Sequence, residues 1–209
     1  QEQAIRVPSE THARFDAKGD LDQYRFEAKG GEPLWIECIA SRIRAGSDPV
    51  LWIDQVTVDA EGIEQFKEIA SNDDSGGNPG GAGFPFRNND CSLLFTPPGD
   101  GNYRLRIHDY TGGGGPADLY RLIIQPGAPG YDLVTTSWYA APAKATKAIS
   151  RHSAVIRRGG TTLLRVFAIR RNGFKDSISL SVEGLPDGID CPPVTLPAGQ
   201  DTATLVLYG

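Results

Sequence analysis

The residues best suited to chemistry gather around segment 71–90, which is long, rich in glycine and acidic at both ends. A stretch of this length without a clear element is unusual in a compact domain unless it is functional or disordered. Calcium takes about 6–8 oxygen ligands from carboxylates and carbonyls, which predicts a calcium site here. The alternative is that these side chains cap turns by accepting backbone N–H hydrogen bonds. The candidate ligands are Asp48, Asn72, Asp73, Asp74 and Asp90.

A serine nucleophile is the second chemical possibility, because the run 73–77 (Asp-Asp-Ser-Gly-Gly) is similar to the nucleophile segment of trypsin-like proteases. None of the three histidines, His12, His108 and His152, lies in that family's histidine motif. A catalytic triad is defined by geometry and role, so scattered Ser, His and Asp residues do not establish one. We therefore interpret Ser75 as a loop residue and predict that the chain is not an enzyme.

Aromatic side chains could bind a sugar or a peptide. Trp138 and Tyr139 follow the predicted domain boundary, and aromatic residues are enriched at interfaces, so they are the candidate ligand-binding or interdomain pair. Aromatic residues at strand positions more often bury their large apolar area in the core. That interpretation applies to Tyr24, Trp35, Trp52 and Tyr103.

The cysteines Cys38, Cys91 and Cys191 match no metal-binding spacing. Cysteine often behaves as a small apolar residue, so three free thiols are the first interpretation. A bridge between Cys38 and Cys91 is the alternative, and the sequence leaves it open.

Charge is distributed unevenly along the 209 residues. Residues 1–126 carry 12 Lys and Arg against 20 Asp and Glu, a net charge of −8, and residues 127–209 carry 9 against 6, a net charge of +3. An acidic first half argues against nucleic-acid binding, which needs a concentrated basic surface. No apolar run approaches the roughly 20 residues that span a membrane. The absence of methionine, even at position 1, indicates a piece of a longer protein.

Short apolar–polar alternations separated by turn residues indicate an all-β fold. Segments 22–28 and 33–40 flank Gly30-Gly31, a pattern that predicts a β-hairpin. Segment 64–68 is compatible with a helical turn or a wide hairpin, and 141–150 has no clear form. Further strands are expected at 50–58, 93–96, 103–107, 119–124, 131–136, 161–169, 178–182 and 203–207.

The chain is expected to fold as two β-sandwich domains. The run 125–130 (Gln-Pro-Gly-Ala-Pro-Gly) discourages regular structure and marks a boundary. We therefore predict domains at 1–126 and 131–209, with a linker at 127–130.

Five motifs in order resemble the bacterial pre-peptidase C-terminal domain, a jelly-roll-like β-sandwich appended to secreted enzymes. They are Asp20 to Phe26, Ser47 to Leu51, Ala70 to Asp74, Asp90 to Leu93, and Pro98 to Asp109. The chain is similar over about residues 5–125 to the collagen-binding modules of clostridial collagenases. Some members of this family bind calcium, so the resemblance implies a calcium site in the acidic segment 71–90.

The second half resembles an immunoglobulin-like domain, through the runs 158–161, 171–174, 182–188 and 196–200. A tandem of this kind looks like those of large exported proteins from planctomycete-type bacteria. Residues 138–150 are longer than the usual connection there, and the chain stops at Gly209, where the family usually adds a strand. These departures leave open whether the second sandwich is complete or has an exposed edge.

The resemblance implies a non-catalytic accessory, binding or spacer module of a larger exported protein, located outside the cytoplasm and stabilised by calcium. Its expected partners are other domains of the same protein, or a polysaccharide or protein of the cell surface or matrix. The alternatives are a carbohydrate- or collagen-type recognition module, which needs an exposed aromatic row on one sheet, and a hydrolase, which needs a clustered nucleophile and base.

Overall fold

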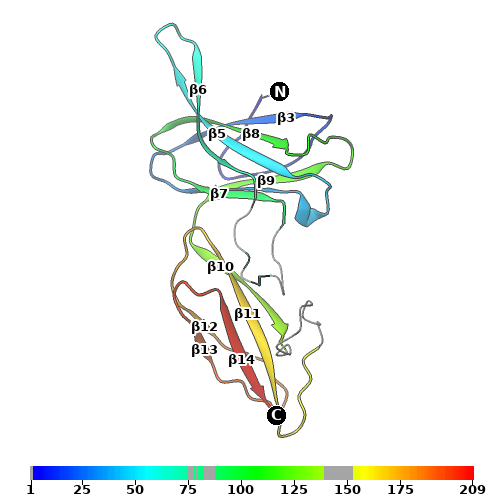
Figure 1. Ribbon diagram of the computed structural model, residues 1–209. Helices are drawn as coiled ribbons and strands as arrows, with labels where there is room; N and C mark the ends of the chain where they lie inside the picture. The colour runs from blue at the N-terminus through cyan, green and yellow to red at the C-terminus, as the bar shows by residue number, and fades with distance from the viewer. Residues whose placement is uncertain (1, 75–77, 79, 82–87, 139–152) are drawn as a thin grey trace. The chain divides into compact units, whose positions relative to one another are not determined.

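A computed structural model describes residues 2–74, 78, 80–81, 88–138 and 153–209 (Figure 1). The described chain is built of β-strands, with a single 3₁₀ turn at Ser41–Ile43, which confirms the all-β prediction. Contacts divide it into two compact units, and the main chain passes from the first to the second at Ala128–Pro129. No helix among the described residues is long and apolar enough to cross a membrane.

The first unit consists of two facing sheets. One has five strands in the order β1-β3-β8-β5-β6, and the other has four in the order β2-β9-β4-β7. Strands β2 to β9 thus form two four-stranded layers, and the chain changes layer after every strand except between β5 and β6, as in a jelly roll, which confirms that prediction. The strands are β1 (Glu2–Ala4), β2 (Ser9–Arg14), β3 (Leu21–Ala28), β4 (Leu34–Ile39), β5 (Pro49–Val58), β6 (Glu64–Asn72), β7 (Cys91–Phe95), β8 (Gly101–Asp109) and β9 (Leu119–Pro126).

The two sheets enclose one apolar core. Alternate residues of each strand point inward, because successive side chains of a strand lie on opposite faces. In β8, for example, Tyr103, Leu105 and Ile107 are fully buried, whereas Arg104 and Arg106 lie between them on the outer face. The ring of Tyr103 packs against both Phe26 and Phe95 and so joins the two layers.

The predicted hairpin at Gly30-Gly31 is wrong, because β3 and β4 belong to different sheets. The chain crosses between the layers there, and it crosses back at 96–100, between β7 and β8. The two crossings touch: Gly31 N donates to the carbonyl of Pro97, and Gly30 N donates to the carboxylate of Asp100. A Cβ on Gly30 would lie 2.7 Å from the Cα of Gly99, so the glycine serves close packing between two crossings.

Segment 64–68 forms the first part of β6, which pairs with β5 in a long hairpin. The pairing with β8 ends at Val56, so the end of this hairpin extends past its neighbour (Figure 1). The register shifts at Ile53/Asp54, which marks a bulge. The sequence analysis missed β1, which is short and pairs in parallel with β3, and β2, whose alternation is mostly polar.

The second unit is a smaller sandwich with its own core. Its sheets have the orders β10-β11-β14 and β12-β13, and both contribute to one cluster that includes Val166, Leu180 and Leu196. The predicted strands are present, and β13 was missed. The segment 141–150 lies outside the described residues. The strands are β10 (Gly130–Ser137), β11 (Thr161–Arg171), β12 (Ile178–Leu180), β13 (Val194–Leu196) and β14 (Thr202–Tyr208).

Gly30→Ala is expected to destabilise the first unit by about 1–3 kcal/mol, the usual cost of forcing an extra methyl group into a packed site. The matched control is Gly99→Ala, whose added methyl group would meet no atom within 4 Å. Denaturant unfolding followed by tryptophan fluorescence compares the two. Equal stability of both variants would contradict the close-packing role of Gly30.

Candidate functional site

The outer face of the five-stranded sheet carries a group of aromatic and charged side chains, which we call the outer strip. In β3, β5 and β8 strand alternation places them there, because most of their neighbours in sequence are buried in the core, and in β6 Phe66 and Glu68 lie opposite Val56 and Asp54. Cross-strand pairing sets Trp52 opposite Arg106 and Asp54 opposite Arg104. The outer strip consists of Arg25, Trp52, Asp54, Phe66, Glu68, Arg104, Arg106 and His108.

The carboxylate of Asp54 holds the middle of the outer strip. It is 2 % exposed and accepts hydrogen bonds from two arginines. Arg104 donates from Nε and Nη2 to Oδ2 at 2.9 and 2.7 Å, and Arg106 donates to Oδ2 and Oδ1 at 2.8 and 3.0 Å. Arg106 also pairs with Glu68 at 3.1 Å. A buried carboxylate with two cationic partners orients both guanidinium groups, since each fork fits it with two N–H groups.

The aromatic rings of the outer strip contact these guanidinium groups. The Cζ of Arg104 lies 3.6 Å from the centre of the Phe66 ring, and the Cζ of Arg106 lies 5.4 Å from that of Trp52. The Trp52 ring also stacks on His108, with centroids 4.8 Å apart. Phe66 remains 42 % exposed. Rings and cations are therefore held in place before any partner arrives.

Arg25 extends the outer strip toward β1 and β6. It forms ion pairs with Glu2 at 3.1 Å and with Glu64 at 2.8 Å, and its Cζ lies 5.6 Å from the Phe66 ring centre. Hydrogen bonds to Glu64 and Glu2 raise the pKa of Arg25 above its usual value. The face thus combines fixed charges of both signs with exposed aromatic area.

Three of the predicted calcium ligands, Asp48, Asp73 and Asp74, are close enough for their charges to influence one another. Burial, followed by the negative charges of Asp74, Asp109 and Asp73, raises the pKa of the half-buried Asp48. Asp73 and Asp74 are exposed. Among the described residues, no group of three or more His, Cys, Asp or Glu side chains is arranged to hold a metal ion. The calcium site therefore stays a prediction.

Asp109, the last residue of β8, binds the adjoining loops at one end of the first unit. Its carboxylate accepts hydrogen bonds from the backbone N–H groups of Asp48 at 2.7 Å and Gly113 at 2.6 Å, and from the Thr111 hydroxyl at 2.5 Å. Burial by itself would raise the pKa of Asp109, but these hydrogen bonds hold it below its usual value. The charge of Asp109 therefore positions the loop that carries Asp48.

The other two predicted ligands, Asn72 and Asp90, bind backbone. Asn72 Oδ1 accepts from Ser92 N at 3.0 Å. Asp90 is fully buried, and its carboxylate accepts from Ala40 N and Ser41 N at 2.7 and 2.6 Å. It also pairs with the side chain of Arg42. Asp90 thereby holds the 3₁₀ turn Ser41–Ile43 that follows β4. This is the turn-capping role that was the alternative to calcium binding.

The aromatic predictions have mixed outcomes. Tyr24 and Tyr103 are in the core as predicted, but Trp35 and Trp52 are half-buried on the outer faces of opposite sheets. The core interpretation is therefore wrong for the two tryptophans, because the strand residues that flank each of them are the buried ones. Sequence reasoning also missed Arg104 and Arg106, although the alternation of 103–107 shows them.

The candidate ligand residue Trp138 packs on the second unit. Its ring lies 6.3 Å from that of Phe167 and under the guanidinium of Arg165 at 5.4 Å. Its backbone N–H donates to Leu163. Tyr139, the other half of the predicted pair, lies outside the described residues, so a ligand role for the pair stays a prediction.

The residues considered for hydrolysis are not brought together within the described part of the chain. His108 stacks on Trp52, and its Nδ1 lies 2.7 Å from the carbonyl oxygen of Asp109. His12 is exposed and contacts Glu10 at 3.0 Å. Ser75 and His152 lie outside the described residues.

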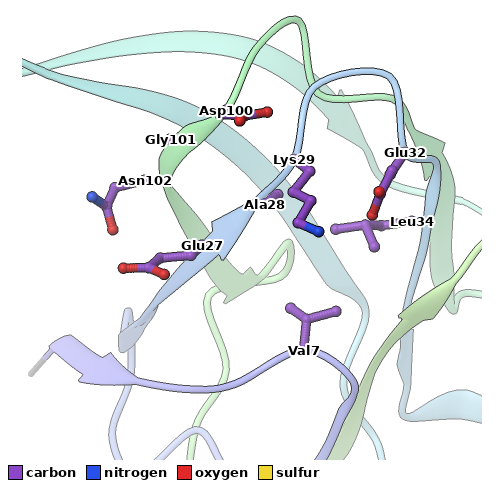
Figure 2. A pocket seen from close by; sticks show the side chains of 9 residues that line it. All are labelled: Val7, Glu27, Ala28, Lys29, Glu32, Leu34, Asp100, Gly101 and Asn102. Carbon is purple, nitrogen blue, oxygen red and sulfur yellow. The ribbon is translucent and has the colours of Figure 1, made fainter.

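A shallow hollow of about 490 Å³ lies at the opposite end of the first unit (Figure 2). Val7 faces the side chains of Lys29 and Leu34 across it, and Glu27 and Asn102 lie at its side (Figure 2). The carboxylate of Asp100 is already engaged by Gly30 N at 2.8 Å. The hollow brings together no nucleophile and base.

Fold and site together define the first unit as a jelly-roll β-sandwich with a charged and aromatic outer face. No protein-family model matches the chain, and no curated protein matches its sequence at a significant level.

Eleven chains of solved structures are similar to this chain, and three of them, described here, each match 60% of its length. The pre-peptidase C-terminal domain of the Bacillus anthracis collagenase is 17% identical, with 95% of that domain covered and a TM-score of 0.42. CorA, a surface-associated copper-binding protein of Methylomicrobium album BG8, is 13% identical, with 98% covered and a TM-score of 0.39. PliG of Aeromonas hydrophila, a periplasmic inhibitor of g-type lysozyme, is 12% identical, with 98% covered and a TM-score of 0.37.

Asp90→Asn is expected to destabilise the first unit by about 2–4 kcal/mol, because one acceptor oxygen becomes an N–H donor facing backbone N–H groups. Glu61→Gln, at the exposed turn between β5 and β6, removes a charge without that loss and should leave stability unchanged. Differential scanning calorimetry of both variants provides the comparison. A normal melting temperature for Asp90→Asn would show that its hydrogen bonds do not hold the turn.

Proposed function

We propose that this chain is a non-catalytic accessory module of a larger exported bacterial protein, and that its outer strip binds a protein partner outside the cytoplasm. The observation that carries the proposal is the prearranged group of aromatic rings and guanidinium groups braced by buried Asp54. Tryptophan and arginine are enriched at the centres of protein interfaces. Side chains that are already ordered lose less conformational entropy on binding, which favours association.

A protein partner fits the outer strip better than a polysaccharide does. Carbohydrate recognition by stacking needs an open face of an aromatic ring. Here Arg104 lies over the Phe66 ring, and the half-buried Trp52 ring contacts both His108 and Arg106, which leaves less ring area open for stacking. Arg25, Glu64, Glu68 and Arg106 instead provide charges of both signs around the rings, which suits a protein surface of complementary charge. The partner is another domain of the same protein or a protein of the cell surface or matrix.

Calcium is a second proposal, supported by the electrostatic proximity of Asp48, Asp73 and Asp74. Mutual repulsion of these carboxylates at the end of the unit would be relieved by a divalent cation. Backbone carbonyl groups and water complete calcium coordination in many proteins, so a full set of carboxylates is not needed. In this arrangement Asn72 and Asp90 shape the surrounding backbone, because both accept backbone N–H groups.

The first test measures retention of the whole chain on two immobilised probes, a triple-helical collagen-like peptide and insoluble cellulose. We expect binding to the peptide that falls at least tenfold in Trp52→Ala, because tryptophan side chains are enriched among the residues that dominate binding energy. Trp35→Ala is the matched control, since Trp35 is half-buried on the outer face of the other sheet. Surface plasmon resonance measures the affinities.

The other outcomes of this test are equally informative. Binding to cellulose that Trp52→Ala abolishes would replace the protein partner with carbohydrate recognition. Binding to the peptide that both tryptophan variants retain would contradict the outer strip as the binding face. Retention on neither probe would favour a spacer without this type of recognition.

For the calcium proposal, the melting temperature of the whole chain is compared with excess calcium and with a chelator. A ligand that binds the folded state stabilises it by about 2.7 kcal/mol at a hundredfold excess over Kd, so the first transition should rise by several degrees. Asp73→Ala and Asp74→Ala should abolish the rise, and Glu61→Ala should keep it. An unchanged melting temperature in the wild-type chain would refute the site.

A further inference from the structure

Two cysteines of the first unit lie directly opposite each other. Cys38 is near the end of β4, Cys91 is the first residue of β7, and the two are register partners in the antiparallel pair. Both are 0 % exposed and belong to the core that the two sheets enclose. Register partners in a sheet project to the same side, so both sulfurs point into the same part of the core.

The separation imposed by this register suits a covalent link. Directly opposite residues of an antiparallel pair have Cα atoms about 4.5–5.5 Å apart, and disulfides occur at Cα separations of about 4.4–6.8 Å. In the structure both Cys38 and Cys91 are free, buried thiols. Opposite Cβ atoms of such a pair lie about 4.5–5.5 Å apart, and those of a disulfide about 3.5–4.5 Å apart, so the bond needs side-chain rotation and a strand shift of about 1 Å.

Neighbouring contacts hold both residues in register. Asp90 immediately precedes Cys91, and its carboxylate binds the backbone N–H groups of Ala40 and Ser41, just after Cys38. On its other side, Cys38 is paired with Leu122 of β9. The two thiols are thus positioned by the sheet itself, and the third cysteine, Cys191, belongs to the core of the second unit.

We propose that Cys38 and Cys91 form a disulfide bond when the chain folds in an oxidising compartment. The oxidant is a disulfide compound, such as oxidised glutathione or a disulfide-transferring enzyme. One cysteine thiolate attacks a sulfur of the oxidant, which releases one thiol and leaves a mixed disulfide. The second cysteine thiolate then displaces the other half of the oxidant. Two cysteine thiols lose two protons and two electrons, and the oxidant is reduced to two thiols.

The bond forms before β7 is fully docked on β4. In the folded unit both sulfurs are inaccessible, and burial together with the neighbouring Cys91 raises the pKa of Cys38 well above its usual value. Because the thiolate is the reacting form, the reduced folded unit is slow to react. Oxidation therefore accompanies folding.

The bridge would close a loop that contains β5 and β6 together with Asp73 and Asp74. Cross-linking the ends of a long loop restrains the unfolded chain and so stabilises the folded one. It would anchor the segment that carries Trp52, Asp54 and Phe66 to the opposite sheet. This inference is independent of the identity of the partner.

The test refolds the whole chain from denaturant in a buffer of reduced and oxidised glutathione. The product is then alkylated under denaturing conditions and weighed by mass spectrometry. We expect one alkylated cysteine, Cys191, and a peptide map that links Cys38 to Cys91. Three alkylated cysteines, or a bridge that includes Cys191, would overturn the proposal. Cys191→Ser is the control and should leave no alkylated cysteine.

Two further measurements address the consequences. The reduced native chain, incubated with the same oxidant, should keep three alkylatable thiols much longer than the refolding chain does. The oxidised chain should melt several degrees above the reduced chain, and Cys38→Ala/Cys91→Ala should lose this difference. Oxidation of the native chain as fast as the refolding chain would overturn the proposed order, and equal melting temperatures would overturn the stabilising role.

Discussion

The outer face of the first unit depends on one buried carboxylate. Asp54 lies at a bulge of the β5–β6 hairpin and accepts the guanidinium groups of Arg104 and Arg106 from the adjacent strand. Without that negative charge, the two arginines would repel each other on neighbouring outward positions of β8. With it, they lie flat against the sheet and support the Phe66 and Trp52 rings. Phe66 and Trp52 therefore each contact a guanidinium group that Asp54 holds in place.

Buried aspartates have the same kind of role elsewhere in the unit. Asp90 accepts hydrogen bonds from backbone N–H groups after β4, and Asp109 accepts them from backbone N–H groups of two loops. Each is almost fully buried and fully hydrogen-bonded, as a charge removed from water must be. Part of the acidity of residues 1–126 is thus internal and structural. The carboxylates of Asp73 and Asp74 differ from these because they are exposed to solvent.

Much of the fold could be predicted from sequence, because alternation of apolar and polar residues directly reflects the two faces of a strand. The strands from 22–28 to 119–124 follow that pattern. The arrangement of strands could not be predicted as well: Gly30-Gly31 has the composition of a hairpin, yet it serves a crossing between sheets. Local turn chemistry is similar in both cases, and only packing against Gly99 distinguishes them.

The candidate site was less predictable for a similar reason. The type of Asp48, Asp73 and Asp90 indicated oxygen ligands, but the roles of Asp90 and Asn72 depend on backbone groups distant in sequence. The outer strip depends on cross-strand neighbours. The sequence shows directly that Arg104 and Arg106 alternate with core residues. Their partner Asp54, however, is 50 residues from Arg104 along the chain.

The charged side chains along β6 also protect the edge of the five-stranded sheet. This strand is the edge of the five-stranded sheet, and an edge strand offers unpaired N–H and C=O groups to any other chain. Glu64, Lys67 and Glu68 line it with charge, and the bulge interrupts its regular register. A second strand that approached this edge would meet charged side chains and a discontinuous ladder. The hairpin can therefore present the exposed ring of Phe66 while its own backbone remains a poor template for aggregation.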